Sequence, residues 1–172
     1  MAEPAALAVR PARGEDLPAL HALIENAYRG DSARGGWTHE ADLIEGPRTS
    51  IEALAALIAD PNERLLAVER DGRLIGSVQL SRAGPDTTYL GLLTVEPGLQ
   101  GGGIGKQVMR AAEAYARDHF SARAIELTAI SVREELIAYY ERRGYARTGE
   151  VRPFPIPLDP PLHFAVMRKP LG

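Results

Sequence analysis

Residues Leu90 to Tyr115 read LGLLTVEPGLQGGGIGKQVMRAAEAY, and the rest of the chain can be arranged around them. The first part is apolar at nearly every position, as expected of a central strand that helices cover on both faces. Pro97 ends that strand. From Ile104 onward the apolar residues recur at helical spacing, which predicts an amphipathic helix. A glycine-dense turn joins the strand to the helix.

The glycines of this turn fall where a helix leaves its first backbone N–H groups without partners. They are Gly98, Gly101, Gly102, Gly103 and Gly105. Without Cβ atoms the backbone can adopt positive φ, and an anion can approach the N–H groups closely. The helix dipole adds partial positive charge at the same place. The turn therefore fits a phosphate or pyrophosphate, although a tight turn also uses glycine for geometry alone, so the spacing has to decide.

Two common phosphate-binding spacings do not match the turn. A P-loop requires glycine where Gln100 stands and a hydroxyl residue where Gln107 stands. The dinucleotide fingerprint requires a third glycine at Lys106 or two residues beyond it. The spacing that does fit is Gln100-x-x-Gly103-x-Gly105, directly after an apolar strand and at the start of a helix.

This pattern resembles the acyl-CoA pyrophosphate loop of the GNAT superfamily, the acyl-CoA-dependent N-acetyltransferases. The resemblance implies that acetyl-CoA (coenzyme A) is the donor, with its pyrophosphate on backbone N–H groups of the turn. It also implies that the pantetheine arm lies along the edge of the central strand. The cofactor-binding residues expected on this basis are Leu93, Val95, Gln100, Gly101, Gly102, Gly103, Ile104, Gly105 and Lys106.

Length and composition exclude several classes of protein. The 172 residues suit one domain, 1–172, and 45% hydrophobic with 25% charged residues is ordinary for a globular chain. A net charge of −3 argues against binding to nucleic acid by bulk electrostatics. Without cysteine there is no thiolate nucleophile, and we expect no metal site. No apolar run is long enough to span a membrane and no signal-peptide pattern is present, so we expect a cytoplasmic protein.

The order of the expected elements is strand, two helices, three strands, helix, strand, helix and two strands. We expect strands at 7–10, 65–70, 73–80, 87–95, 124–130, 146–151 and 163–169, and helices at 16–30, 51–59, 104–118 and 134–143. Asp71-Gly72 predicts a tight hairpin, and Thr49-Ser50-Ile51-Glu52 is a capping-box signature. The pattern predicts an α/β (α+β) fold. It resembles the whole GNAT fold, which implies a mixed, mostly antiparallel seven-stranded sheet flanked by about four helices.

A second motif is Tyr139-Tyr140-Glu141-Arg142-Arg143-Gly144-Tyr145. It is similar to a GNAT segment in which a tyrosine stands four residues before the glycine that ends the last helix. In that family this tyrosine often lies near the thioester sulfur and protonates the departing thiolate, which implies a catalytic role for Tyr140. Leu136, Ile137 and Tyr140 also form an apolar helix face, so packing in the core is the alternative.

The chain also departs from the family pattern. Arg133 stands where the family often has an asparagine that contacts the cofactor; an arginine there can pair with a phosphate or lie solvated at the helix start. Some members carry a glutamate base on the central strand, where this chain has Tyr89. The loop that holds Trp37, His39 and Glu40 lies on the acceptor side in the family, which implies substrate binding by these residues. A solvent-facing loop explains them equally well.

These features together imply an N-acetyltransferase that moves an acetyl group from acetyl-CoA to a primary amine by direct attack in a ternary complex. The acceptor, a small molecule or a peptide, stays open, as does the length of the acyl group. We expect neither nucleic acid nor membrane as a partner, and a homodimer is compatible with the sequence. The alternative is a non-catalytic acyl-CoA-binding sensor or regulator, since no general base is evident. Turnover with a panel of amines would separate the two.

Overall fold

The structure, a computed structural model, describes residues 7–28, 49–99, 103–153 and 159–171. Seven strands form one sheet in the order β1-β2-β3-β4-β5-β7-β6. The strands are β1 (Ala8–Pro11), β2 (Glu63–Arg70), β3 (Arg73–Arg82), β4 (Thr87–Val95), β5 (Ala124–Ile130), β6 (Ala146–Pro153) and β7 (His163–Pro170). The helices are α1 (Leu17–Tyr28), α2 (Ile51–Ala59), α3 (Ile104–Phe120) and α4 (Glu134–Arg142), with 3-10 turns η1 (Gly14–Asp16) and η3 (Pro97–Leu99). The predicted fold class and element order are confirmed.

Local signals in the sequence account for most of these boundaries. Asp71 and Gly72 have φ of 55° and 75°, as the predicted hairpin between β2 and β3 requires. Helix α2 begins after Ser50, whose Oγ accepts a hydrogen bond from the N–H of Ala53 at 3.0 Å. The cap is therefore a single serine, and the capping-box spacing from Thr49 is not used.

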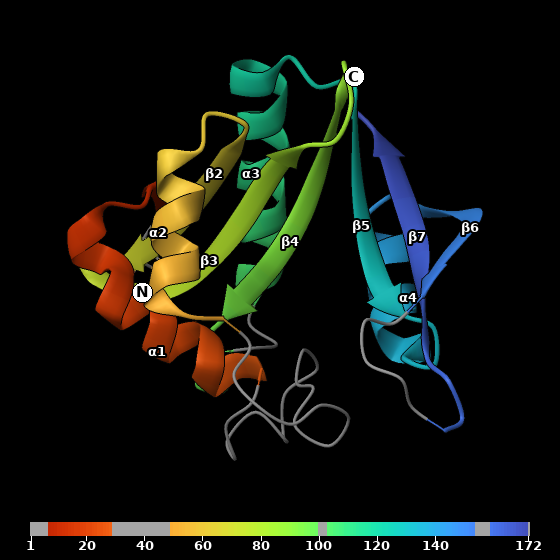
Figure 1. Cartoon of the computed structure of the whole chain (residues 1–172), viewed down its shortest axis with the longest axis horizontal. Helices are drawn as coiled ribbons and strands as arrows, with labels where there is room; N and C mark the ends of the chain where they lie inside the picture. The colour runs from red at the N-terminus through yellow and green to blue at the C-terminus, as the bar shows by residue number, and fades with distance from the viewer. Residues whose placement is uncertain (1–6, 29–48, 100–102, 154–158, 172) are drawn as a thin grey trace, which may run out of the picture.

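The sheet has a hydrophobic core on each face. In Figure 1, α1 and α2 lie on the viewer's side of the sheet and α3 lies behind it. Strand β2 serves both cores, because Leu65 packs with α1 and α2 while Leu66 packs with α3. Strand β4 does the same through Leu92 and Leu93, which confirms that it is a central strand covered on both faces. Within the described ranges, no helix has the length and apolarity needed to cross a membrane.

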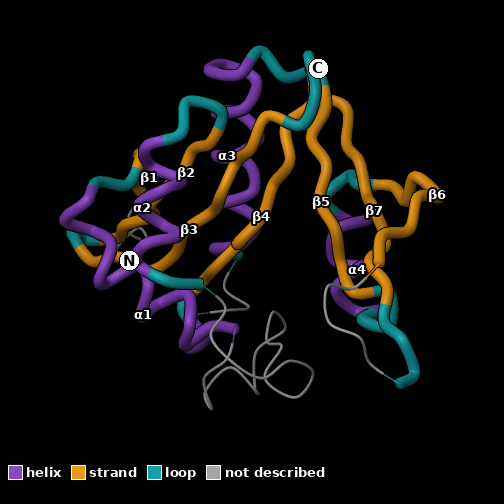
Figure 2. The backbone as a smooth tube through the Cα atoms, in the orientation of Figure 1, coloured by secondary structure: helices purple, strands orange, loops and turns teal. Residues whose placement is uncertain are grey.

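Among the described strands, β4 and β5 are the one parallel pair, and they pair over a short length. Their ladder joins Thr87–Tyr89 to Ala124–Glu126, and beyond it the two strands run apart (Figures 1 and 2). All the other neighbouring strands are antiparallel. Because α3 and α4 follow β4 and β5, both helices begin near the C-terminal ends of these strands, where the two strands have separated.

Candidate functional site

Strand β4 carries a β-bulge beyond its ladder with β5. Ser77 pairs with Thr94 and Gln79 pairs with Gly91, so β4 has one more residue than β3 between these two pairs. Leu92 lies in this stretch with φ of 47°, a left-handed conformation that is uncommon outside glycine. The hydroxyl of Thr94 donates to the carbonyl of Leu92 at 3.0 Å and supports it. Bulges and strained residues of this kind cluster at functional sites.

No pattern in the sequence points to Leu92 itself. The available signal was Gly91, because a glycine inside an apolar strand often marks a bulge. Leu93 and Val95, which were predicted to position the donor, are 3% and 1% exposed and pack in the core beside α3. Their predicted part in binding is therefore limited to the backbone of β4.

The described part of the glycine turn has the conformation that the sequence predicts. Gly103 caps α3 with φ of 81°, and a Cβ there would have no described atom within 4 Å, so the glycine is required for its conformation rather than for space. Ile104, Gly105 and Lys106 are the first helical residues. Gln100, Gly101 and Gly102 lie outside the described residues.

The start of α3 offers hydrogen-bond donors to an anion. The N–H groups of Ile104, Gly105 and Lys106 have no partner within the helix, since its first bond runs from the N–H of Gln107 to the carbonyl of Gly103 at 3.2 Å. The first turn holds no acidic residue, and the side chain of Lys106 is exposed. These donors, with the helix dipole, suit a phosphate group at the end of β4.

Tyr140 lies on the buried face of α4 and is 6% exposed. Its ring meets Tyr139 and Tyr145 edge to face, with centroids 5.7 and 6.1 Å apart. Leu136 and Ile137 are buried in the same core, so the predicted apolar face of this helix is confirmed. The acid role of Tyr140 stays a prediction.

The phenols on either side of Tyr140 hold their protons firmly. Burial is the main cause that raises the pKa of Tyr145, and the adjacent Glu113 carboxylate raises it further. Burial also raises the pKa of Tyr139, and the charges of Arg143 and Arg142 partly oppose that shift. These two tyrosines are therefore neutral hydrogen-bond donors at physiological pH rather than bases.

Arg133 caps the N-terminus of α4 and is half-buried. Its N–H donates to the carbonyl of Ile130 at 2.9 Å, directly after β5. Arg133 and Gly103 thus cap two helices that both start near the C-terminal ends of the central strands β4 and β5. The structure does not test its predicted contact with the donor.

The acceptor side is only partly described. Trp37, His39 and Glu40 lie outside the described residues, so their predicted roles stay predictions. Tyr89 stands where some family members carry a glutamate base. Its hydroxyl forms a hydrogen bond with Thr128 Oγ1 at 2.7 Å. That bond joins β4 to β5 just past the last pair of their ladder.

Known proteins share both this sequence pattern and this fold. The chain matches the model of the acetyltransferase (GNAT) family over residues 21–145. It is also 33% identical over 110 residues to erythronolide synthase EryA3 of Saccharopolyspora erythraea, a match that covers 60% of this chain and only 3% of that protein.

Solved structures of N-acetyltransferases superpose on nearly the whole chain. Spermidine N-acetyltransferase from Vibrio cholerae, in complex with CoA and spermine, has a TM-score of 0.73 at 21% identity and covers 96% of this chain and 95% of its own. The ribosomal-protein-S18-alanine N-acetyltransferase from Escherichia coli has a TM-score of 0.74 at 15% identity, with 97% and 95% covered. At these identities the likeness concerns the fold. The family model covers well over half of the sequence, and the chain therefore belongs to the acetyltransferase (GNAT) family.

Proposed function

We propose that this chain transfers an acetyl group from acetyl-CoA to a primary amine by direct attack in a ternary complex. One observation carries the proposal: α3 begins at a left-handed Gly103 near the C-terminal ends of β4 and β5, where these two strands have separated. A ligand bound beside the end of β4 would reach the N–H groups that the first turn of α3 leaves without partners inside the helix. Membership of the acetyltransferase family and a structural neighbour solved with CoA support the same donor.

The residues at this edge fit a nucleotide-linked thioester. The N–H groups of Ile104, Gly105 and Lys106 would hold its diphosphate, and the bulged backbone near Leu93 and Val95 would align its extended arm. When bound, acetyl-CoA supplies an activated acyl group whose leaving group is a thiol. The side chains of the protein then have to orient the amine, stabilise the oxyanion and return a proton.

The proton balance assigns a role to Tyr140. When the amine nitrogen bonds to the acyl carbon, the bond from carbon to sulfur breaks, the departing sulfur takes a proton, and the nitrogen loses one, which restores the proton donor. A thiol has a pKa of ~8.5 and a phenol ~10, so a tyrosine hydroxyl can donate that proton at neutral pH. A backbone N–H of β4 would stabilise the oxyanion.

The amine must be neutral before it attacks. An alkylammonium has a pKa of ~10.4 and needs a base or a water chain, whereas an α-amine, at ~7.7–8, largely does not. Strand β4 contains neither a carboxylate nor a histidine. A base for an alkylamine would therefore come from another part of the chain or from a water chain, and His39 and Glu40 remain the candidates.

The donor assignment is tested at Gly103. Gly103→Asp places a carboxylate against the anion site; no described atom lies within 4 Å of a Cβ there, and the left-handed φ of 81° strains the aspartate as it strains the asparagine of the control below. Titration calorimetry should detect acetyl-CoA binding to the natural protein and none to this variant. Gly103→Asn is the matched control, because asparagine has the same shape without the charge and adopts the left-handed conformation readily. Tight binding by Gly103→Asp would overturn the assignment.

The acid role is tested by Tyr140→Phe. We expect kcat to fall by roughly 10²–10⁴-fold while the Kd for acetyl-CoA stays nearly unchanged. Tyr139→Phe, one residue away on α4, is the control and should keep its turnover. The assay follows thiol release with a panel of polyamines, amino acids and peptides. Unchanged turnover in Tyr140→Phe would refute the acid role, and tight acetyl-CoA binding without turnover of any amine would favour the sensor.

A further inference from the structure

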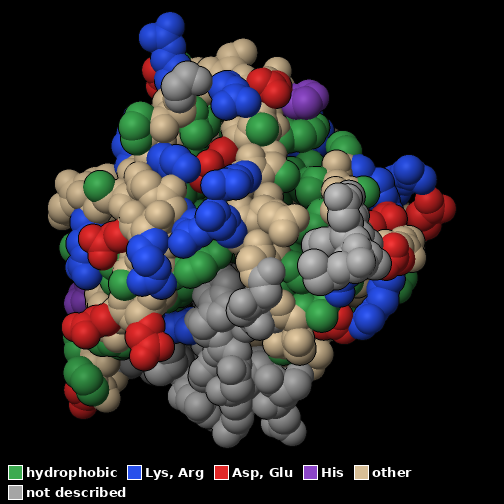
Figure 3. All heavy atoms as spheres, turned by 180° about the vertical axis from the view of Figure 1, so that it is seen from behind, with side chains coloured by type: hydrophobic (Ala, Val, Ile, Leu, Met, Phe, Trp, Pro, Cys, Tyr) green, Lys and Arg blue, Asp and Glu red, His purple; other side chains and the backbone are tan. Residues whose placement is uncertain are grey.

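A basic pocket of about 190 Å³ lies between α3, α4 and β7, on the face of the sheet that α3 covers. Its lining consists of Lys106, Met109, Arg110, Glu113, Arg142, Arg143 and Lys169. Five cationic side chains thus surround one carboxylate. Figure 3 shows Lys and Arg side chains gathered near the middle of this face.

The carboxylate in this basic pocket is already neutralised. Glu113 is 8% exposed, and it accepts hydrogen bonds from the Tyr145 hydroxyl and from Lys169 Nζ, each at 2.9 Å. The positive charge of Lys169 therefore neutralises the Glu113 carboxylate. Among the described residues, no carboxylate forms an ion pair with the four other cations, Lys106, Arg110, Arg142 and Arg143.

The Nε–H of Arg143 is a buried hydrogen-bond donor without an acceptor among the described residues. Its guanidinium carbon lies 5.2 Å from the centroid of the Tyr139 ring, which holds the side chain in place. Its Nε is buried, and no acceptor in the described part of the chain reaches it. A buried donor without an acceptor costs free energy, as does the crowding of like charges around it. An anion in the pocket would relieve both.

The basic pocket continues the site at the start of α3. Lys106 belongs to both, since its N–H is one of the helix-start donors and its side chain lines the pocket. Arg110 follows Gly103 by seven residues, which is about 10 Å along a helix. A diphosphate at the helix start would therefore leave the ribose at its end within reach of the pocket.

We infer that the basic pocket binds the 3′-phosphate on the ribose of the acyl donor, an inference that rests on the proposed function. A phosphate monoester carries close to two negative charges and three acceptor oxygens, which matches several arginines and a lysine. The consequence is donor selection: the chain binds acetyl-CoA in preference to the same thioester without the 3′-phosphate. Solvated surface cations would give no such preference.

The test compares acetyl-CoA with 3′-dephospho-acetyl-CoA by titration calorimetry on the whole chain. The natural protein should bind acetyl-CoA about 10–100-fold more tightly, as expected for charge-assisted hydrogen bonds to one phosphate. The double variant Arg110→Gln/Arg142→Gln should bring this ratio close to one by weakening acetyl-CoA alone. Arg117→Gln is the matched control, since Arg117 lies on the same helix, is exposed and pairs with Asp118 outside the pocket.

A second measurement uses fragments of the donor. Adenosine 3′,5′-bisphosphate should compete with acetyl-CoA more strongly than adenosine 5′-monophosphate does, because the two differ only in the 3′-phosphate, and the double variant should lose this difference. Equal affinity of the natural protein for both thioesters would overturn the pocket assignment and leave the acetyltransferase proposal intact. A double variant whose affinity for the two thioesters falls by the same factor would also overturn the pocket assignment and leave the acetyltransferase proposal intact. Failure of the natural protein to bind either thioester would overturn the pocket and the proposed function together.

Discussion

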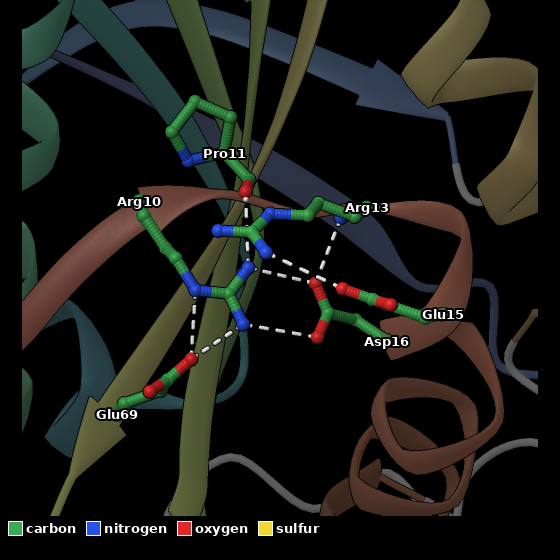
Figure 4. A network of polar contacts seen from close by, with 6 residues as sticks. All are labelled: Arg10, Pro11, Arg13, Glu15, Asp16 and Glu69. Atoms are coloured by element: carbon green, nitrogen blue, oxygen red, sulfur yellow. Dashed lines mark hydrogen bonds and ion pairs between the residues drawn. The ribbon is translucent and has the colours of Figure 1, made fainter. Parts of the chain in front are cut away.

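Arg10 is the centre of a polar cluster that fastens the first strand to the sheet. Its guanidinium donates to both carboxylate oxygens of Asp16, at 2.7 and 2.9 Å, and its Nε donates to Glu69 at 2.7 Å (Figure 4). Asp16 also accepts the N–H of Arg13 at 2.8 Å and is 9% exposed. The bond from Arg10 is the main cause that lowers the pKa of Asp16 from 3.8 to about 2. The cluster thus joins β1, β2 and the turn before α1.

The lowered pKa of Asp16 predicts a loss of stability in acid. Because the folded state prefers the ionised carboxylate, its stabilisation is present above pH ~4 and is lost as the pH falls toward 2. Asp16→Asn should cost on the order of 1–2 kcal/mol at pH 7, and its difference from the natural protein should shrink below pH 4. Urea unfolding at pH 7, 5 and 3 measures this.

The control for Asp16→Asn is Glu15→Gln. The Glu15 side chain is 73% exposed and pairs only with the exposed Arg13 among the described residues, so its removal should change stability little. A deficit in Asp16→Asn that is the same at pH 7 and pH 3 would contradict the assignment of the acid loss to this carboxylate.

At the scale of elements, β3 and β4 approach unusually closely beside the bulge. A Cβ built on Gly76 would lie 2.6 Å from the carbonyl oxygen of Thr94, a backbone atom of the neighbouring strand. Gly76→Ala must therefore push the end of β4 away from β3, next to Leu92 and the start of α3. We expect a loss of stability of about 1–3 kcal/mol, measured by urea unfolding.

Gly84, in the turn that joins the same two strands, supplies the comparison for Gly76. The nearest atom to a Cβ there is Thr87 Cβ at 3.9 Å, an ordinary contact, and its φ is not positive. Gly84→Ala should leave stability within about 0.5 kcal/mol of the natural protein. Equal effects of the two substitutions would show that β4 can shift without cost, and that the bulge is not held by close packing against β3.

Elements whose ends are set by local chemistry could be predicted from the sequence. The hairpin at Asp71-Gly72 depends on positive φ at two adjacent residues, and the start of α3 depends on Gly103. The bulge at Leu92 could not be predicted, because leucine has no preference for its left-handed φ and the conformation is imposed by the neighbouring strand. Helix α2 has the predicted bounds, but its cap is Ser50 and the capping-box signature begins one residue earlier, because Thr49 and Ser50 are both good caps.

At the scale of the whole molecule, the candidate site combines residues that are distant in the sequence. The glycine turn is local and was predicted, whereas the pairing of Glu113 with Tyr145 and Lys169 joins α3, the start of β6 and β7. Single-sequence patterns give the face on which a residue lies but not its neighbour across the fold. The short ladder between β4 and β5 escaped prediction for the same reason, although the site depends on it.

Few hydrogen bonds join β4 to β5. Beyond their ladder, which ends at Tyr89, the Tyr89 hydroxyl bonds to Thr128. At the ladder itself, Arg168 of β7 donates to Thr87 of β4 at 3.3 Å and to Glu126 of β5 at 3.0 Å. The Tyr89 to Thr128 bond stands where the strands begin to separate, so it limits how far the opening extends toward the ladder.

Tyr89→Phe removes that bond and keeps the ring. We expect a loss of about 1 kcal/mol in unfolding free energy and faster amide exchange at Ala124–Glu126 of β5, because the opening can then extend into the ladder. The β2–β3 hairpin lies in the other half of the sheet, and the exchange rates of its amides should change only as far as the global free energy of unfolding changes. A uniform change in exchange across both halves would mean that the hydroxyl stabilises the molecule as a whole and does not control the separation of β4 from β5.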